Sequence, residues 1–220
     1  SCARSNCLFL TAISYSFIRF SIDPSIENIC NSLTYLDTKT YNIIYVGQLN
    51  NRKGVDLLLN SLINIKVNYC LNIIGKGVSE NKLRQLCETT NLADKVNFLG
   101  NLENKIVQAH IRASDLLVLP SRWDGWGAVV SEALIQGTPV IATDKCGSSM
   151  LLQDYFKGEV VESESIFALE KAITTRIKNG KTTKEQRNKI LEWSKCLHGD
   201  IAAQYMINCI TGKKPKNPWL

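Results

Sequence analysis

Residues 116–143 read LLVLPSRWDGWGAVVSEALIQGTPVIAT. An apolar run ends at Pro120, a Gly-rich loop follows, and a helical stretch over Ala128–Gln136 ends at Gly137. A second apolar run then covers Pro139–Ala142. A buried strand, a helix closed by glycine and another buried strand are typical of a parallel sheet covered by helices. The stretch therefore predicts an α/β fold.

The same alternation of strand and helix precedes this unit. Right-handed crossovers between such units build an open sheet, so we predict a Rossmann-like doubly wound parallel sheet with a helical C-terminal segment. A short strand near Val160–Val161 and two or three helices are expected to complete it. The other predicted strands are Tyr41–Val46, Val67–Ile74, Lys95–Leu99 and Leu116–Leu119, and the other helices are Gly54–Ile65, Ser79–Thr90 with Ser79 as its cap, and Glu103–Ala113.

The domain organisation follows from length and from a change of pattern at Tyr41. A chain of 220 residues that is 45% hydrophobic suits one domain with a real core. Residues 1–40 carry weak signals and are interpreted as the remnant of a preceding domain or a linker. Residues 41–220 are interpreted as the Rossmann-like domain with its C-terminal helices. Cys7–Ile22 is apolar but contains Arg19, and it is too short to predict a membrane span.

Composition narrows the class of partner. The net charge of +6 suits anionic ligands such as phosphates, and it permits peripheral contact with an anionic membrane surface. The lysines and arginines are spread out without a basic run and interleaved aromatics, so no nucleic-acid partner is expected. The eight cysteines form no C-x-x-C pair and have no histidine at metal spacing. We therefore expect no metal site and a reducing, cytoplasmic compartment.

The first loop at the carboxyl end of the predicted sheet, where such sheets bind ligands, carries cations. Gly47 and Gln48 open it, and Arg52 and Lys53 precede a helix N-terminus. A helix N-terminus already attracts anions, so the added cations favour a diphosphate site. A solvated turn with two ordinary cations is the alternative.

The second and third loops are less specific. Gly75-Lys76-Gly77 lacks the third glycine of the dinucleotide fingerprint, which argues against a nicotinamide dehydrogenase. Its glycines let a backbone approach a ligand or close a turn. Phe98 and Leu99 end the third strand, where a nucleotide base has room to lie, or where they only complete the core.

The fourth loop combines two carboxylates with a helix start. Asp124 lies in the Gly-rich loop, and Glu132 lies about one and a half turns inside the following helix. Carboxylates accept hydrogen bonds from vicinal sugar hydroxyls, and the first N–H groups of a helix bind phosphate oxygens. The alternative makes Asp124 a helix cap and Glu132 a surface charge. The candidate ligand contacts here are Asp124, Gly125, Trp126, Gly127, Ala128, Val129 and Glu132.

Five motifs follow one another along the chain: Tyr45–Leu49 with Arg52–Gly54, Ile73–Gly77, Val96–Gly100, Ala113–Ser121 and Asp124–Thr143. In this order they resemble the C-terminal nucleotide-sugar-binding domain of group 1, family 4 retaining glycosyltransferases, which have the GT-B fold. The resemblance implies transfer of a hexose-type sugar from a nucleotide-diphosphate sugar to a carbohydrate or lipid-linked acceptor, with retention and with no metal or other cofactor. It also implies a cytoplasmic enzyme, peripheral at the inner face of the membrane, in cell-surface polysaccharide biosynthesis.

The resemblance also assigns roles to three catalytic candidates. Asp124 is expected to contact hydroxyls of the donor sugar, Glu132 the ribose, and Lys53 the leaving diphosphate, whose developing charge it stabilises. The family usually has Glu at the first acidic position and an Arg where this chain has Gln48. We hypothesise that Arg52 compensates for that missing cation.

The family's acceptor site and catalytic histidine belong to an N-terminal domain. We therefore expect this chain to be a fragment that binds donor but transfers poorly without such a domain in cis or in trans. The main alternative is a non-catalytic nucleotide-sugar-binding module that partners a separate transferase half. A GT-B-fold epimerase fits the Asp124 loop less well, and a plain interaction domain leaves the five motifs unexplained.

Overall fold

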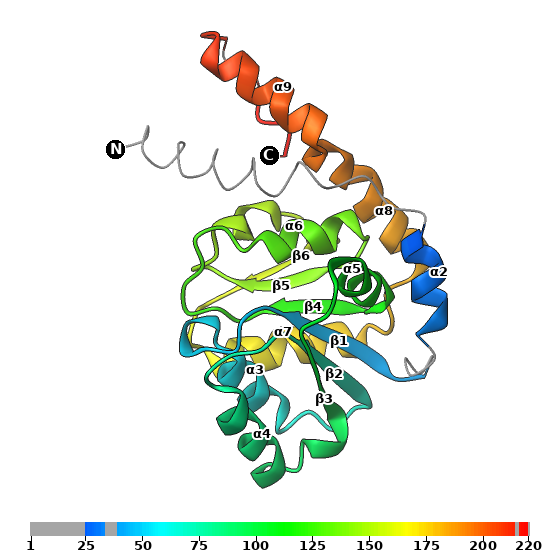
Figure 1. Ribbon diagram of the computed structural model, residues 1–220, viewed down its shortest axis with the longest axis vertical. Helices are drawn as coiled ribbons and strands as arrows, with labels where there is room; N and C mark the ends of the chain where they lie inside the picture. The colour runs from blue at the N-terminus through cyan, green and yellow to red at the C-terminus, as the bar shows by residue number, and fades with distance from the viewer. Residues whose placement is uncertain (1–24, 34–38, 214–215, 220) are drawn as a thin grey trace.

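The fold is a six-stranded parallel sheet between two layers of helices (Figure 1). The computed structural model of the chain describes residues 25–33, 39–213 and 216–219. The predicted α/β, Rossmann-like fold class is confirmed. The strands are β1 (Tyr41–Val46), β2 (Tyr69–Ile74), β3 (Val96–Gly100), β4 (Leu116–Leu119), β5 (Val140–Thr143) and β6 (Gly158–Val161).

The strand order β3-β2-β1-β4-β5-β6 fixes where a ligand can bind. The chain first moves outward from β1 to β3, and then returns to place β4 on the other side of β1. The loops that follow β1 and β4 therefore leave the sheet in opposite directions and open a crevice between them. This crevice lies outside the carboxyl ends of two adjacent strands.

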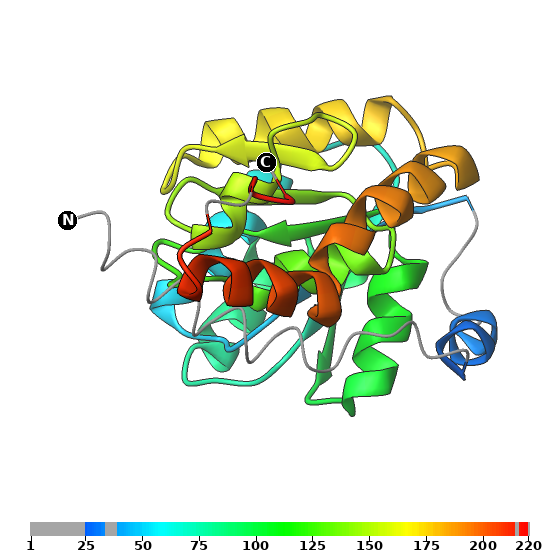
Figure 2. The ribbon, with the colours of Figure 1, turned by 90° about the horizontal axis from the view of Figure 1, so that it is seen from above.

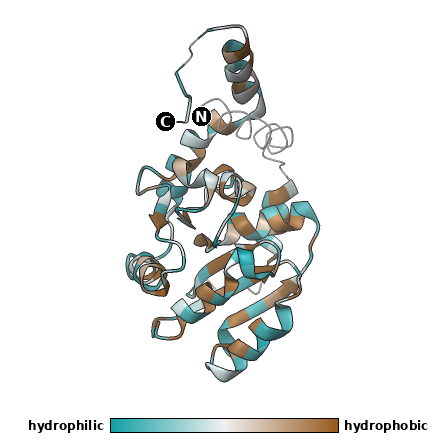
Figure 3. Cartoon of the chain, turned by 90° about the vertical axis from the view of Figure 1, so that its left-hand side faces the viewer, coloured by the Kyte–Doolittle hydropathy of each residue, from teal (hydrophilic) through white to brown (hydrophobic). Residues whose placement is uncertain are grey.

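Helices cover both faces of the sheet (Figure 1). Their hydrophobic residues alternate with hydrophilic ones (Figure 3), as expected of helices that bury one side against a sheet. All residues of β4 and β5 are buried, so the centre of the sheet is the core of the domain. One face carries α3 (Val55–Leu62), α4 (Glu80–Thr89) and α7 (Ile166–Lys178), and the other carries α5 (Asn104–Ala113), α6 (Ala128–Ile135) and α8 (Lys184–Ser194).

Two further helices lie at the ends of the described chain. Helix α2 (Ser25–Ser32) falls within the segment interpreted as a remnant or linker, and it packs against α5 with Ile26 buried. Cys7–Ile22 lies outside the described residues. Helix α9 (Gly199–Ile210) continues from α8 and extends beyond the two layers (Figures 1 and 2). In the described part of the chain, no helix has both the length and the apolar character needed to cross a bilayer.

The predicted cap of α4 is wrong. Ser79 precedes this helix, but its backbone is already helical and its side chain makes no capping hydrogen bond. A capping serine needs an extended backbone, from which its oxygen reaches the N–H groups of the first turn. Thr183 has that geometry at the start of α8, where it forms a capping box with Gln186.

Candidate functional site

The β1–α3 loop brings two cations to the crevice. Its residues Asn51–Lys53 form a short 3-10 turn, and the side chain of Asn50 accepts a hydrogen bond from the Lys53 N–H at 3.2 Å. Gly54 follows with φ 66°, and a Cβ atom there would lie 2.1 Å from the carbonyl oxygen of Pro120. Only glycine allows this approach, so the loop lies directly against the end of β4.

The approach of the two loops pairs the cations with the first acidic residue. The Lys53 ammonium donates a hydrogen bond to Oδ2 of Asp124. The Arg52 guanidinium lies 4.0 Å from Oδ1 of Asp124 and donates to the carbonyl oxygen of Trp123 at 3.2 Å. The Lys53 and Asp124 side chains are 15% and 10% exposed, so the contact is largely shielded from water. Two predicted catalytic residues, 71 positions apart, thus touch.

The loop that carries Asp124 is held by the segment after β5. The Asp124 N–H donates to the carbonyl of Lys145 at 3.0 Å, and the Ser148 N–H donates to the carbonyl of Trp126 at 2.8 Å. The Trp126 side chain is buried in the core, so this predicted ligand contact anchors the loop with its ring. Gly125 beside it is exposed.

The start of α6 follows this loop without a side-chain cap. Gly127 is the capping residue, with φ 76°, and no side chain caps the helix. The interpretation of Asp124 as the cap is therefore wrong. The first N–H groups of any α-helix lack acceptors within the helix, which applies here to Ala128 and Val129. These donors begin four residues after Asp124, the carboxylate that pairs with Lys53.

Glu132 projects from α6 toward α5. Gln108 of α5 donates from Nε2 to Oε2 of Glu132 at 3.1 Å, and Gln136 donates to Oε1 of Gln108 at 3.3 Å. Burial raises the pKa of Glu132 above its ordinary value, and the Gln108 hydrogen bond opposes this rise. The carboxyl group is thus a half-buried, oriented acceptor rather than a solvated surface charge. Sequence reasoning missed Gln108, because its contact depends on how α5 packs on α6.

A cavity of about 410 Å³ opens at the ends of β1 and β2. The predicted contacts Gly47, Gln48 and Gly75 line it, whereas Phe98 and Leu99 do not. The Phe98 ring lies under the Arg84 guanidinium, with 4.4 Å between the guanidinium carbon and the ring centroid. Strand β3 continues to Gly100, so the loop residues that reach the cavity come later in the sequence. The full lining is Val46, Gly47, Gln48, Ile74, Gly75, Lys76, Asn101, Leu102 and Val107.

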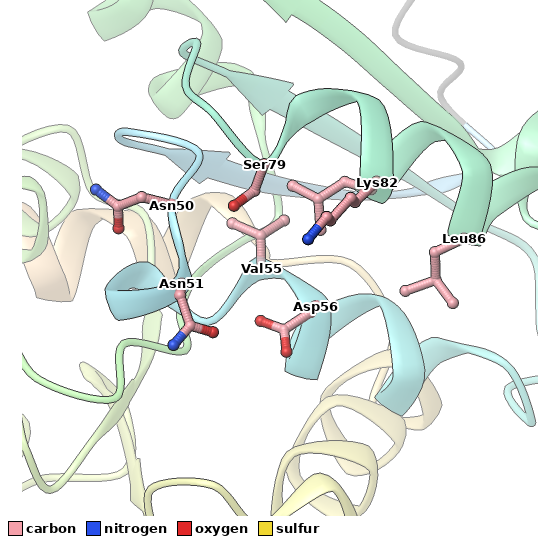
Figure 4. A pocket seen from close by; sticks show the side chains of 8 residues that line it. Asn50, Asn51, Val55, Asp56, Ser79, Lys82 and Leu86 are labelled. Carbon is pink, nitrogen blue, oxygen red and sulfur yellow. The ribbon is translucent and has the colours of Figure 1, made fainter.

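A second cavity, of about 440 Å³, lies between the starts of α3 and α4 (Figure 4). None of the predicted site residues lines it. Its lining is Asn50, Asn51, Val55, Asp56, Ser79, Lys82, Leu83 and Leu86.

Comparison with known proteins places the chain in a family. The family model of group 1 glycosyl transferases matches residues 34–193, and the chain belongs to this family. It is 30% identical over 155 residues to an uncharacterized 41.2 kDa protein in the cps region of Klebsiella pneumoniae, which covers 69% of this chain and 41% of that protein. It is 31% identical over 134 residues to a GDP-mannose-dependent alpha-(1-6)-phosphatidylinositol monomannoside mannosyltransferase of Mycobacterium tuberculosis, covering 56% of this chain and 35% of that enzyme. The chain therefore spans less than half the length of these relatives.

Solved structures share the fold. The apo form of the lipopolysaccharide outer core galactosyltransferase WaaB matches with a TM-score of 0.73 and 21% identity, over 80% of this chain and 50% of WaaB. The HepE protein of Anabaena in complex with UDP matches with a TM-score of 0.73 and 19% identity, over 86% of this chain and 53% of that chain. Identities this low support a common fold.

Proposed function

We propose that this domain binds a nucleotide-diphosphate sugar in the crevice between the β1 and β4 loops. In this proposal it is the donor-binding part of a retaining glycosyltransferase that transfers a hexose-type sugar to a carbohydrate or lipid-linked acceptor. The observation that carries the proposal is the meeting of Lys53, Arg52 and Asp124 at the strand-order reversal, with the half-buried Glu132 on the helix that follows.

The cations would bind the diphosphate. Lys53 lies at the crevice with its ammonium against a carboxylate, and an ammonium has three donors, so it can bind a phosphate oxygen as well. Arg52 is 41% exposed and adds a second positive charge. The N–H groups at Gly127–Val129 supply uncharged donors. Negative charge grows on the diphosphate as the sugar leaves, and these groups would stabilise it without a metal ion.

The two carboxylates would bind the two sugars of the donor. Asp124 is held between the cations and would accept hydrogen bonds from hydroxyls of the transferred hexose. Glu132 lies on α6 beside Gln108 and would accept from the ribose hydroxyls. Burial raises the pKa of Glu132, and the Gln108 N–H opposes this rise by favouring the ionised form, which accepts hydrogen bonds with both oxygens.

The relatives support this choice of donor class. The mannosyltransferase named above is described as GDP-mannose-dependent, and HepE has been solved with UDP and glucose. Relatives also include a lipopolysaccharide core mannosyltransferase of Rhizobium meliloti, which favours a role in cell-surface polysaccharide synthesis. We propose that the acceptor is held by an N-terminal domain of the kind that these longer relatives have room to carry.

Calorimetric titration of the chain with UDP, GDP and ADP tests the proposal. Saturable binding of one diphosphate is expected, and Lys53→Ala should weaken it. Lys181→Ala is a matched control, because this lysine also pairs with an aspartate but at the amino end of the sheet. If the folded chain binds none of the three nucleotides, the proposed function is wrong.

A further inference from the structure

Arg122 lies in the loop after β4 and joins three other segments. Its Nη1 donates to the carbonyl oxygen of Asn51 at 2.7 Å, and its backbone N–H donates to the carbonyl of Arg52 at 2.9 Å. Nη1 and Nη2 donate in parallel to the two carboxylate oxygens of Asp56, at 2.8 and 2.7 Å. Nε donates to Glu164, which precedes α7, at 3.1 Å.

We infer that Arg122 is a positioning residue of the donor site, which holds the loop carrying Lys53 against the loop carrying Asp124. Its side chain binds Asn51 in the first loop, before Lys53, and Asp56 in the first turn of α3, after Lys53. Arg122 itself precedes Asp124 by two residues. One guanidinium therefore fixes the spacing between the ammonium and the carboxylate. The inference rests on the proposed function, because it assigns Arg122 to the diphosphate-binding loop of that site.

The chemistry of the contact requires arginine. The planar guanidinium matches both oxygens of a carboxylate at once, whereas a lysine ammonium acts as a point charge on a flexible stem. The hydrogen bonds from Arg122 hold the pKa of Asp56 below its usual range, so the carboxylate stays ionised at neutral pH. The Arg122 side chain is 22% exposed and that of Asp56 is 39% exposed, so the pair is partly shielded from water. Figure 4 shows Asn51 and Asp56, two residues that Arg122 binds, at the start of α3.

The effect of the second phosphate on affinity distinguishes a positioning role of Arg122 from a general effect of Arg122 on stability. The probes are the diphosphate that the parent chain binds best among UDP, GDP and ADP, and the monophosphate of the same nucleoside. Arg122→Gln should weaken diphosphate binding about ten-fold, because displaced Lys53 no longer meets the second phosphate. Binding of the monophosphate should change little. Asp56→Asn should reproduce this pattern, and Arg122→Lys should fall between the parent and Arg122→Gln.

Arg176→Gln is the matched control. Arg176 also donates to a backbone carbonyl, that of Tyr155, at 2.6 Å, but near the C-terminal end of α7. Its replacement should leave both affinities unchanged. A folded Arg122→Gln protein that keeps the parent ratio of diphosphate to monophosphate affinity overturns the inference, whether its affinities are unchanged or equally weakened. Absence of nucleotide binding by the parent chain instead overturns the proposed function.

Discussion

Each end of the sheet carries an aspartate beside a lysine and an arginine, but the two clusters are built differently. In both, the aspartate is buried and its cations come from elements distant in sequence. The carboxyl-end cluster is Asp124 with Lys53 and Arg52, and the amino-end cluster is Asp115 with Lys181 at 3.4 Å and Arg187 at 3.7 Å.

The amino-end cluster has its hydrogen bonds within the domain. Arg187 of α8 donates to the carbonyl oxygens of Arg112 and Ser114, at 2.9 and 2.7 Å, besides facing Asp115. Asp115 also accepts the N–H of Asn42 at 2.9 Å. This cluster ties α8 to the sheet, and its polar groups are already occupied.

The carboxyl-end cluster is set on loops and faces a crevice. Arg52 is 41% exposed, and α6, which no side chain caps, begins four residues beyond Asp124. The same three residue types therefore serve the fold at one end and are available to a ligand at the other. The direction of the strands, rather than the residue types, therefore distinguishes the structural cluster from the candidate site.

The largest effect on stability is expected from the amino-end cluster. Asp115→Ala leaves the Arg187 guanidinium without its carboxylate partner, which should cost about 3–5 kcal/mol of unfolding free energy. Urea denaturation followed by circular dichroism measures this loss. Nucleotide affinity of the folded fraction should stay at the parent level. A weakened affinity would contradict the assignment of the amino-end cluster to the fold and of the carboxyl-end cluster to the ligand.

Lys53→Ala should show the reverse pattern. Losing a charged donor to phosphate should weaken diphosphate binding by about 10- to 100-fold. The unfolding free energy should fall by less than in Asp115→Ala, because Arg52 still faces the Asp124 carboxylate after Lys53 is lost. Calorimetry and urea denaturation of the same preparation measure both. A stability loss as large as that of Asp115→Ala would indicate that the carboxyl-end cluster also stabilises the fold.

Glu132→Gln tests whether the second acidic residue strengthens nucleotide binding while it lowers the stability of the fold. Its folded-state pKa is raised above 4.5, so the native state keeps the proton to higher pH than the unfolded chain. Stability therefore falls as pH rises from the unfolded pKa through the folded one, and the loss persists at neutral pH. The variant should be more stable than the parent at pH 7, with a difference that shrinks below pH 4.5, and should bind the nucleotide about ten-fold more weakly. Melting temperatures of the variant and the parent across this pH range show which of the two is more stable.

The smallest effect is expected from Lys181→Ala. Lys181 is 38% exposed and donates to the Thr40 carbonyl at 2.8 Å as well as pairing with Asp115, so its loss should cost about 0.5 kcal/mol. Nucleotide affinity should not change. Lys53→Ala and Lys181→Ala together compare two lysines, each paired with an aspartate, at opposite ends of one sheet. Equal effects of the two variants on nucleotide binding would contradict a ligand site confined to the carboxyl end.

Much of the fold was predictable because local sequence patterns indicate the strands and helices. Apolar runs that end at Gly or Pro predicted the strands, and the β1 and β4 boundaries match at both ends. The cap at Ser79 and the orientation of Phe98 were not predictable in this way. The first depends on the backbone angles of one residue, and the second on the side of the sheet to which the ring turns.

The sequence by itself determined the order of strands and helices, the family, and the residues that could hold a donor. The tertiary structure alone decided which of them meet. Lys53 reaches Asp124 and Arg122 reaches Asp56 because β1 and β4 become neighbours across 66 to 71 residues of chain. Burial of Glu132 beside Gln108 likewise depends on the packing of α5 against α6. Local preferences act over a few residues, whereas these contacts arise only when crossover connections bring distant strand ends together.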